Sequence, residues 1–248
     1  MSALRTSALT KRFGAVAALD GVDLALPQGA RHALIGPNGA GKTTLIDVLT
    51  GALAPSSGEV FLGDDRVTGL AQHARARRGL TRTHQVTSLF PGLTVLEAVM
   101  IAILERDGLA GRWWRPVAAH RAQLEEARSL LATLRLEADA DRVTADLAYG
   151  RQRLLEIALG LASRPKILLL DEPAAGIPAA ESRELLGVVS RLPADVTVLF
   201  IEHDMDLVFR FAERITVLVA GRVLAEGSPA EIAADERVRA AYLGEAAA

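Results

Sequence analysis

A glycine-rich stretch joins the apolar run Ala33-Leu34-Ile35 to a helical pattern, and it reads Gly36-Pro37-Asn38-Gly39-Ala40-Gly41-Lys42-Thr43. This order fits the phosphate-binding pattern G-x-x-x-x-G-K-[ST], whose glycines let the backbone turn tightly and aim successive N–H groups at phosphates. The positive end of the following helix points at the same place. We therefore expect Lys42 to reach the β- and γ-phosphates of a nucleotide and the Thr43 hydroxyl to bind Mg²⁺. The alternative, a plain glycine turn, is disfavoured by the order of strand, loop, Lys-Thr and helix.

Elsewhere in the chain, short apolar runs alternate with helical patterns. The first 35 residues predict short antiparallel strands with a turn at Pro27-Gln28-Gly29. Later apolar strands separated by helices favour a parallel sheet covered on both faces, so the expected fold class is α/β. Strands are expected at residues 59–62, 167–170, 196–201, 215–219 and 222–226. Helices are expected at residues 42–50, 71–78, 180–192 and 205–211, with a short helical cap within 228–248.

Residues 86–160 differ from the rest of the chain because they show no strand pattern. Helical segments are expected at 93–104, 117–136 and 154–162. This stretch therefore predicts an all-helical subdomain inserted into the α/β body. Residues 1–85 and 161–248 would form the nucleotide-binding core, which includes the antiparallel β subdomain.

Two adjacent acids, Asp171 and Glu172, follow the apolar run at residues 167–170. Open α/β sheets bind their ligands beyond the carboxyl ends of the strands, which is where these carboxylates are expected. Asp171 is suited to hold Mg²⁺ through its water shell, and Glu172 is placed to take a proton from an attacking water. The alternative is a pair of acids that complement the dipole of the next helix, and the phosphate loop disfavours it.

His203 follows a second apolar strand, at residues 196–201, within Glu202-His203-Asp204. A lone histidine at such a position is more often a structural or capping group. Because neighbouring parallel strands end on the same crevice, its imidazole is also expected near the γ-phosphate and near Glu172. Gln85 ends the run Thr81-Arg82-Thr83-His84-Gln85 at the entrance to the helical subdomain, and on its own this run indicates a solvated polar loop.

The composition excludes several other classes of protein. With 248 residues, of which 50% are hydrophobic, the chain can bury a sizeable core, which excludes disorder. The formal net charge of -2 gives no general attraction to nucleic acid, so no nucleic-acid partner is expected. The absence of cysteine excludes disulfides and zinc-thiolate sites. The apolar runs are shorter than the about 18 residues of a membrane span, and the N-terminal residues lack the apolar core of a secretory signal. We expect a cytosolic chain whose membrane contact goes through a partner.

Taken together, these motifs resemble those of the ATP-binding subunits of ABC transporters, over essentially the whole chain. The resemblance implies a RecA-like P-loop core with an antiparallel β subdomain and an inserted helical subdomain. It implies that Gln85 touches the metal and the attacking water, that His203 bridges the γ-phosphate and Glu172, and that Phe13 stacks on adenine. Ordinary core packing is the alternative for Phe13.

The same resemblance implies ATP and Mg²⁺ as cofactors and gives each candidate residue a role. The implied metal ligands are Thr43, Gln85 and Asp171, and the implied catalytic residues are Glu172, His203 and Gln85. The implied nucleotide contacts are Phe13, Gly36, Pro37, Asn38, Gly39, Ala40, Gly41, Lys42, Thr43 and Thr44.

The signature of this family, usually L-S-G-G-Q, matches Leu147-Ala148-Tyr149-Gly150-Arg151. The resemblance implies that Ala148, Tyr149, Gly150 and Arg151 contact an ATP held by a second subunit. Ala148 lacks the serine hydroxyl that normally meets the γ-phosphate, which leaves Gly150 and the helix N-terminus to supply the anion contacts. Pro178 stands where the dimer-contact loop of the family often has Asn or Asp, which affects one inter-subunit hydrogen bond.

The form Leu-Ala-Tyr-Gly is similar to that of ATPases from branched-chain amino acid transporters, a group that includes amide and urea importers. Leu49-Thr50-Gly51, residues 168–176 and the ending Ala241-Tyr242-Leu243-Gly244-Glu245 point the same way. This implies an ATPase at the cytoplasmic face of the membrane that powers import and binds transmembrane permease subunits. It also implies a second ATP-binding subunit, identical or a sister chain, and an indirect partner in a periplasmic or extracytoplasmic solute-binding protein.

Three other functions are alternatives to this interpretation. Residues 168–176 and the chain ending also resemble the ATPase of lipopolysaccharide export, so an exporter ATPase of the same fold is one. A soluble ABC ATPase that acts on ribosomes or DNA is another, although such proteins usually fuse two halves or insert long coiled coils. A P-loop GTPase is disfavoured because the chain has no N-K-x-D motif.

Two further clusters of side chains lie outside these motifs. Trp113 and Trp114 are the only tryptophans of the chain, and they suit either contact with a membrane subunit or its lipid edge, or packing within the helical subdomain. The basic run Arg75, Arg77, Arg78 and Arg82 is interpreted as a solvated helix face.

Overall fold

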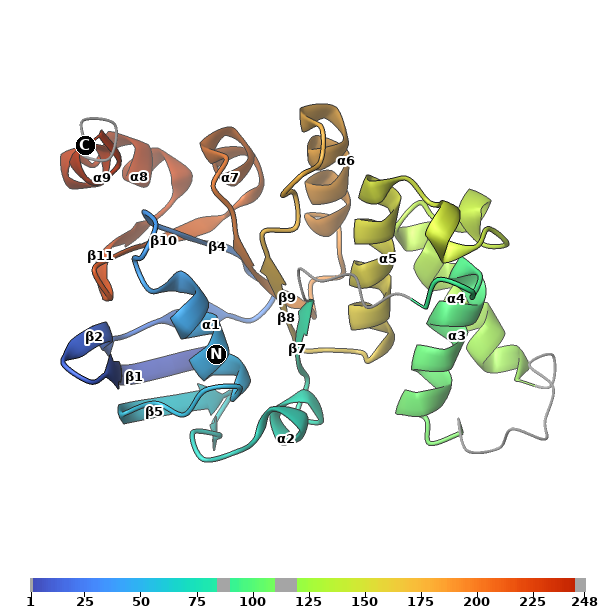
Figure 1. Ribbon diagram of the computed structural model, residues 1–248, viewed down its shortest axis with the longest axis horizontal. Coiled ribbons are helices and arrows are strands. Elements are labelled where there is room, and N and C mark those ends of the chain that lie inside the picture. The colour runs from blue at the N-terminus through green and yellow to red at the C-terminus, as the bar shows by residue number, and fades with distance from the viewer. Residues whose placement is uncertain (1, 84–89, 110–119, 244–248) are drawn as a thin grey trace. The chain divides into compact units, whose positions relative to one another are not determined.

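The computed structural model describes residues 2–83, 90–109 and 120–243 of the chain. Gln85, Trp113 and Trp114 lie outside these ranges. The chain forms two compact units, of which the first contains residues 1–82, 166–172 and 193–248 and the second contains residues 83–165 and 173–192. Figure 1 labels most helices and strands of both units.

The first unit contains an antiparallel sheet formed mainly by the start of the chain. Its strands are β1 (Ser2–Phe13), β2 (Val16–Val22), β3 (Ala25–Pro27), β5 (Ser57–Leu62) and β6 (Asp65–Arg66). Strand β1 pairs antiparallel with β2, β3 and β5, and β6 extends the sheet beyond β5. The short antiparallel strands expected in the first 35 residues are therefore present.

A second sheet in the same unit is mostly parallel. Its order is β11-β10-β4-β9-β8-β7, in which β10, β4, β9 and β8 run parallel and β11 pairs antiparallel with β10. Every residue of β4 and β9 is buried, as expected for strands covered on both faces. The strands are β4 (Arg31–Ile35), β7 (Leu80–Thr83), β8 (Ile167–Asp171), β9 (Thr197–Ile201), β10 (Arg214–Val219) and β11 (Arg222–Gly227).

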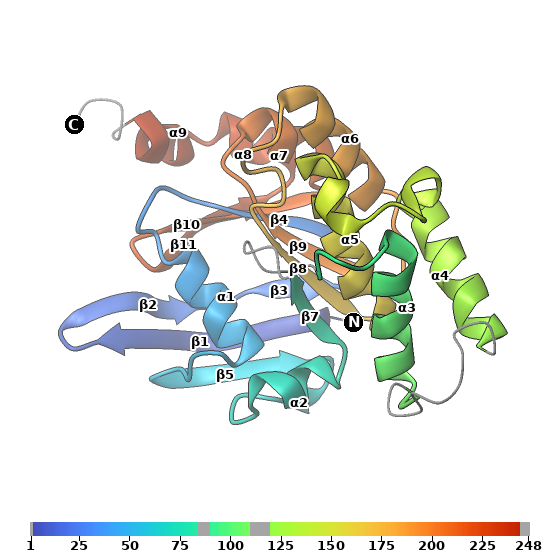
Figure 2. The ribbon, with the colours of Figure 1, turned by 45° about the vertical axis from the view of Figure 1, so that its right-hand side comes forward.

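Helix α1 (Lys42–Thr50) lies between the two sheets, as Figures 1 and 2 show. Its buried side chains join apolar residues of both sheets in one cluster, and each fully buried leucine contributes about 1.5 to 3 kcal/mol relative to an exposed one. This packing fixes where α1 begins relative to the end of β4, and so it positions the loop between them. The cluster includes Leu4, Leu26 and Val60, Leu34, Leu169 and Leu199, and Leu45, Ile46 and Leu49.

Short helices complete the first unit. They are α2 (Gln72–Ala76), α7 (Met205–Phe211), α8 (Pro229–Ala234) and α9 (Glu236–Leu243). Asp204 caps α7 by accepting hydrogen bonds from the N–H groups of Asp206 and Leu207. Ser228 and Glu231 form a capping box at the start of α8.

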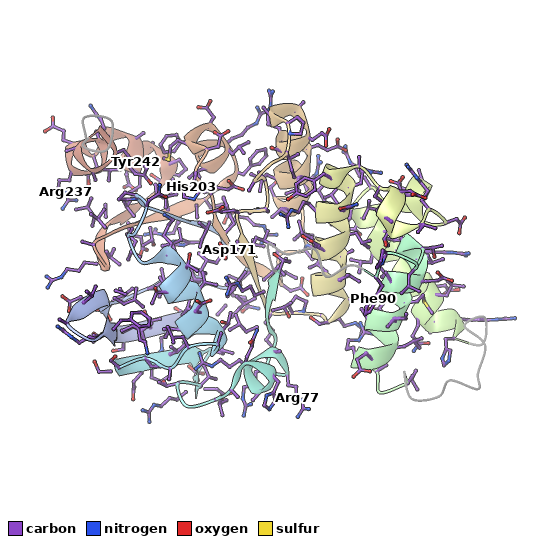
Figure 3. All side chains as sticks on the ribbon, viewed as in Figure 1. Arg77, Phe90, Asp171, His203, Arg237 and Tyr242 are labelled. Carbon is purple, nitrogen blue, oxygen red and sulfur yellow. The ribbon has the colours of Figure 1, made fainter. Side chains whose placement is uncertain are left out.

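Arg75 of α2 is buried rather than solvated, with 1% of its surface exposed. Its guanidinium donates hydrogen bonds to the carbonyl oxygens of Val48 and Leu49, in the last turn of α1, and to those of Thr68 and Leu70. The carbonyl groups at the end of a helix have no partner within the helix, so Arg75 satisfies part of this need for α1. The interpretation of a solvated face is therefore wrong for Arg75, whereas Arg77, labelled in Figure 3, is exposed.

Replacing Arg75 with Met should lower the free energy of unfolding by about 3 kcal/mol or more, because buried carbonyl groups lose a charged donor. Urea titration of the purified variant measures this loss. Arg77→Met is the matched control, and since Arg77 is exposed its substitution should change the free energy of unfolding by less than about 0.5 kcal/mol. Equal stability of the two variants would show that Arg75 does not support the end of α1.

The regular structure in the described part of the second unit is helical, apart from Thr83 at the end of β7 and an isolated β-bridge between Thr94 and Val143. Its helices are α3 (Val95–Arg106), α4 (Arg121–Thr133), α5 (Tyr149–Ala162) and α6 (Ala179–Val189), with 3-10 turns at Glu137–Asp139 and Thr144–Asp146. Arg106 and Arg164 both bind Glu126, at 2.6 and 2.8 Å, and thereby tie α3 and the end of α5 to α4. The hydrogen bond from Arg106 holds the pKa of Glu126 below its ordinary value.

The second unit is larger than the helical subdomain expected at residues 86–160. It also contains residues 161–165 and 173–192, because α6 packs against α5. In the ranges that the structure describes, none of the helices is both long and apolar enough to span a membrane.

Candidate nucleotide-binding site

The glycine-rich loop connects β4 to α1, and the surrounding backbone fits closely against two of its glycines. Gly36 has φ 155°, and a Cβ added there would lie 2.1 Å from the carbonyl oxygen of Leu218 in β10. Gly41 has φ 101°, and a Cβ there would lie 2.4 Å from the carbonyl oxygen of Ala18 in β2. Only glycine fits at these two positions, so β2 and β10 fix the path of the loop.

Lys42, the first residue of α1, is folded over the loop and is 8% exposed. Its Nζ donates hydrogen bonds to the carbonyl oxygens of Gly36 and Pro37, at 2.6 and 2.9 Å. The N-cap of α1 is Gly41, which has no side chain to cap the helix, so the first N–H groups can meet an anion. Thr43, Asn38 and Gly39 are exposed, and Thr44 is half-buried. This arrangement suits the binding of phosphate groups over the loop.

Acidic and imidazole side chains follow the neighbouring strands β8 and β9. These strands are parallel, and Asp171 is in register with Ile201, so both end at the same edge of the sheet. The N–H of Glu172 donates to the carbonyl oxygen of Ile201, and Glu172 has φ 49°. A left-handed conformation is costly for a residue other than glycine, and such residues are concentrated at functional sites. The left-handed conformation of Glu172 therefore supports the prediction that this residue is functional.

His203 lies against Glu172, as expected from the order of the strands. Its Nε2 is 2.6 Å from Oε1 of Glu172, and the two side chains are 48% and 27% exposed. Figure 3 labels His203 together with Asp171. The pair is open to solvent and therefore to a nucleotide and a water molecule. The roles of Glu172 as base and of His203 as its partner stay predictions.

Asp171 pairs with an arginine that the sequence analysis had assigned to a solvated face. Nη2 of Arg82 lies 2.6 Å from Oδ2 of Asp171, and Nη1 of Arg82 lies 2.6 Å from Oδ1 of Asp47. The side chain of Arg82 is only 12% exposed, so the interpretation of a solvated residue is wrong here too. Sequence reasoning missed this contact, and the one available signal was that Arg82 closely precedes Gln85.

The residues predicted to bind Mg²⁺ have a suitable chemistry. Mg²⁺ prefers oxygen ligands, and in nucleotide sites it is held by one or two protein side chains, by phosphates and by water. The exposed Thr43 hydroxyl and the carboxylate of Asp171 are such ligands. Gln85, the third predicted ligand, lies outside the described residues.

Phe13 is 52% exposed, which disfavours its alternative role in core packing. It lies at the end of β1, in register with Val16 of β2, which is 67% exposed. The carbonyl oxygen of Ala18, two residues further along β2, contacts Gly41 of the phosphate loop. The exposed position of Phe13, next to Val16 on the strand that contains Ala18, supports the prediction that Phe13 stacks on adenine.

The signature residues belong to the second unit and surround the start of α5. Ala148 is the N-cap of α5 and makes no side-chain cap, so the helix N-terminus is uncapped by a side chain. Gly150 adjoins Glu181 so closely that a Cβ on it would lie 2.4 Å from the carboxylate. Nη2 of Arg151 binds Asp139 at 2.6 Å, and the Tyr149 hydroxyl accepts a hydrogen bond from Arg153. The contact of these residues with ATP stays a prediction.

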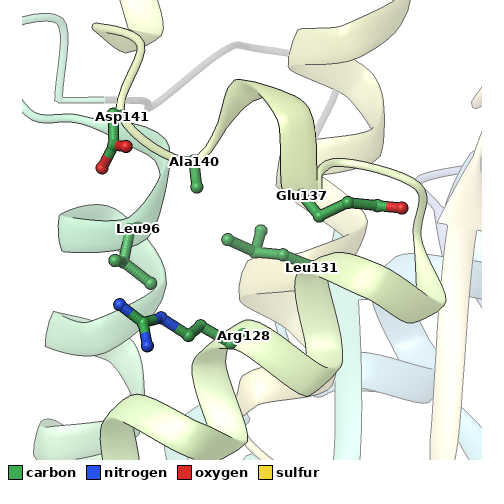
Figure 4. A pocket seen from close by; sticks show the side chains of 6 residues that line it. All are labelled: Leu96, Arg128, Leu131, Glu137, Ala140 and Asp141. Atoms are coloured by element: carbon green, nitrogen blue, oxygen red, sulfur yellow. The ribbon is translucent and has the colours of Figure 1, made fainter.

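A cavity of about 290 Å³ in the second unit is shown in Figure 4. It lies among α3, α4 and the turn after α4, and none of the predicted site residues lines it. Its lining residues are Leu96, Arg128, Leu131, Glu137, Ala140 and Asp141. We therefore do not assign the nucleotide to this cavity.

The loop, the acids at the end of β8 and the adjacent histidine define a P-loop domain of the nucleotide-hydrolysing class. A family model described as ABC transporter matches residues 19–175, and one described as branched-chain amino acid ATP-binding cassette transporter matches residues 222–248. The chain belongs to the ABC transporter family, as one of its ATP-hydrolysing subunits. This confirms the resemblance and the α/β fold that the motifs implied.

Individual relatives agree with this assignment. The chain is 41% identical to the high-affinity branched-chain amino acid transport ATP-binding protein BraF of Pseudomonas aeruginosa, over 98% of both chains. It is 40% identical to the corresponding protein LivG of Escherichia coli, again over 98% of both chains. The crystal structure of the ADP conformation of MJ1267, an ATP-binding cassette of an ABC transporter, matches with a TM-score of 0.86 and 31% identity, over 98% of this chain and 99% of that one.

Proposed function

We propose that this chain is the ATP-binding and ATP-hydrolysing subunit of an importer for branched-chain amino acids or related amides. The observation that carries the proposal is the match over nearly the full length to BraF, together with the match of residues 222–248 to the branched-chain amino acid family model. The geometry of the phosphate loop and of the Glu172–His203 pair supports the chemistry that such a subunit needs.

In the proposed mechanism, the phosphate loop and the start of α1 bind the triphosphate. The Lys42 ammonium exchanges its bonds to Gly36 and Pro37 for oxygens of the β- and γ-phosphates. Glu172 takes a proton from the attacking water, and His203 orients the Glu172 carboxylate from 2.6 Å. Thr43 and Asp171 would hold Mg²⁺, which supplies charge neutralisation on the phosphates when bound.

We also propose that the site is completed by a second ATP-binding subunit, identical or a sister chain. The signature residues Ala148 to Arg151 would meet the phosphates held by the partner, mainly through Gly150 and the N-terminus of α5. Shifting a two-state element from 1:99 to 99:1 requires about 5.5 kcal/mol. Charge-assisted hydrogen bonds to the γ-phosphate contribute about 1.5 to 3 kcal/mol each, so a few of them across two sites are sufficient.

The proposed partners follow from this role. Transmembrane permease subunits would bind the chain at the cytoplasmic face of the membrane, and a solute-binding protein outside the membrane would act on it indirectly. Trp113 and Trp114, outside the described residues, remain candidates for the permease contact.

Reconstitution of the chain with the permease subunits that neighbouring genes encode would test the proposal. Proteoliposomes should take up radiolabelled leucine or a related amide when ATP is present on the side of this subunit and the solute-binding protein is on the other. The same vesicles with Glu172→Gln provide the control without hydrolysis. ATP-dependent efflux of a lipid would instead favour the exporter alternative, and lack of any complex with the permeases would favour a soluble ATPase.

A further inference from the structure

We propose that Arg82 is a positioning residue for the Mg²⁺ site, acting through Asp171 and Asp47. The inference rests on the proposed function, because it concerns the metal that accompanies ATP. Arg82 lies in β7 and connects two elements that are remote in the sequence, since Asp47 belongs to α1 and Asp171 closes β8.

The Arg82 guanidinium bridges two carboxylates through two short hydrogen bonds. One terminal nitrogen of Arg82 contacts Asp47 and the other contacts Asp171, each at 2.6 Å. A planar guanidinium presents its donors in a rigid fork, so two carboxylates bound in this way are held in fixed orientations. The Asp171 and Arg82 side chains are 9% and 12% exposed, so water competes little for this contact.

Asp171 divides its two oxygens between different tasks in this arrangement. Oδ2 accepts the hydrogen bond from Arg82, and Oδ1 has no hydrogen-bond partner among the described residues. A carboxylate that is anchored by one oxygen offers the other to a metal ion or its bound water in a defined direction. Groups that orient metal ligands in this way typically affect metal affinity by about 10- to 100-fold.

The second contact of Arg82, to Asp47, is to helix α1, which also contains the predicted Mg²⁺ ligand Thr43. Thr43 and Asp47 are four residues apart in α1, so they lie on the same face of the helix. By holding Asp47, Arg82 links the helix turn with Thr43 to the end of β8 with Asp171. A purely structural ion pair would tie α1 to the sheet but would leave metal binding unchanged.

The test is the Mg²⁺ dependence of nucleotide binding in Arg82→Gln. Binding of a fluorescent ADP analogue is measured in EDTA and over a titration of Mg²⁺. In EDTA the dissociation constant should stay within about twofold of the original, because the phosphate loop is intact. The Mg²⁺ concentration for half-maximal effect should rise about 10-fold or more.

Three variants give the experiment its controls. Arg66→Gln removes another ion-paired arginine of the same unit, whose partner is Glu59 and which is 63% exposed, and it should leave the Mg²⁺ dependence unchanged. Asp47→Asn keeps the contact between Arg82 and Asp171 but weakens the contact at position 47. It should therefore give an intermediate rise in the Mg²⁺ requirement. Arg82→Lys keeps the positive charge but not the two-pronged guanidinium, so its Mg²⁺ requirement should also be intermediate. It replaces Arg82→Gln in the test if that variant does not fold.

An unchanged Mg²⁺ requirement in folded Arg82→Gln, or in Arg82→Lys where the former does not fold, would overturn the inference and leave the proposed function intact. Failure of the unmodified protein to bind the ADP analogue at all would instead overturn the proposed function, and the inference with it.

Discussion

Replacing Glu172 with Gln should slow ATP hydrolysis by about 10²- to 10⁴-fold while ATP binding is retained. An amide has nearly the same shape as a carboxylate, but it cannot take the proton from the attacking water. The variant retains the phosphate loop and Lys42, so affinity should change little. Phosphate release under saturating ATP measures the rate, and equilibrium binding of radiolabelled ATP measures the affinity.

The same variant should accumulate in the closed, paired state. If ATP joins two subunits and hydrolysis separates them, a protein that binds but does not hydrolyse ATP should elute as a dimer in gel filtration with ATP and as a monomer with ADP. Glu59→Gln is a suitable control, because Glu59 is a carboxylate paired with Arg66 whose side chain is 41% exposed. Near-normal turnover in Glu172→Gln would refute the assignment of Glu172 as the base.

Much of the fold was predictable because it depends on local sequence patterns. Helices α1 and α7 begin and end at the expected residues, and β8 extends one residue beyond the run expected at 167–170. Helix α1 is followed by a clear terminating signal, Gly51, and helix α7 begins after the capping residue Asp204. Strand β7 escaped prediction because its residues Leu80-Thr81-Arg82-Thr83 have one apolar member, and their strand conformation depends on pairing in the sheet.

In the candidate site, too, the features that depend on local sequence were predictable and the long-range contacts were not. The phosphate loop is encoded by consecutive residues, and the approach of His203 to Glu172 follows from the rule that parallel strands end at one edge. The contacts of Arg75 and Arg82 could not be foreseen in this way. Arg82 contacts residues that are 35 and 89 positions away, and Arg75 contacts carbonyl groups that any residue type provides. Charge alone favoured solvent exposure for both, and tertiary hydrogen bonds reversed that expectation.

Replacing Lys42 with Ala should weaken ATP binding itself, by about 10²-fold. Lys42 is predicted to reach the β- and γ-phosphates, and a charge-assisted hydrogen bond contributes about 1.5 to 3 kcal/mol. Two such bonds would contribute about 3 to 6 kcal/mol. In the free protein, however, the ammonium already donates to Gly36 and Pro37. Binding exchanges these bonds rather than creating new ones, so the net loss should be near 3 kcal/mol, or about 10²-fold.

Isothermal titration with ATP measures this loss, and circular dichroism establishes that the variant is folded. Lys166→Ala is the matched control, because Lys166 is an exposed lysine of the same unit. The ATP affinity of this variant should equal that of the original protein. The contrast with Glu172→Gln is the sharper test, since one variant should lose binding and the other only turnover. Unchanged ATP affinity in Lys42→Ala would overturn the assignment of residues 36–43 as the phosphate loop. The role of Glu172 as the base would then also fail, because it requires an ATP bound at this loop.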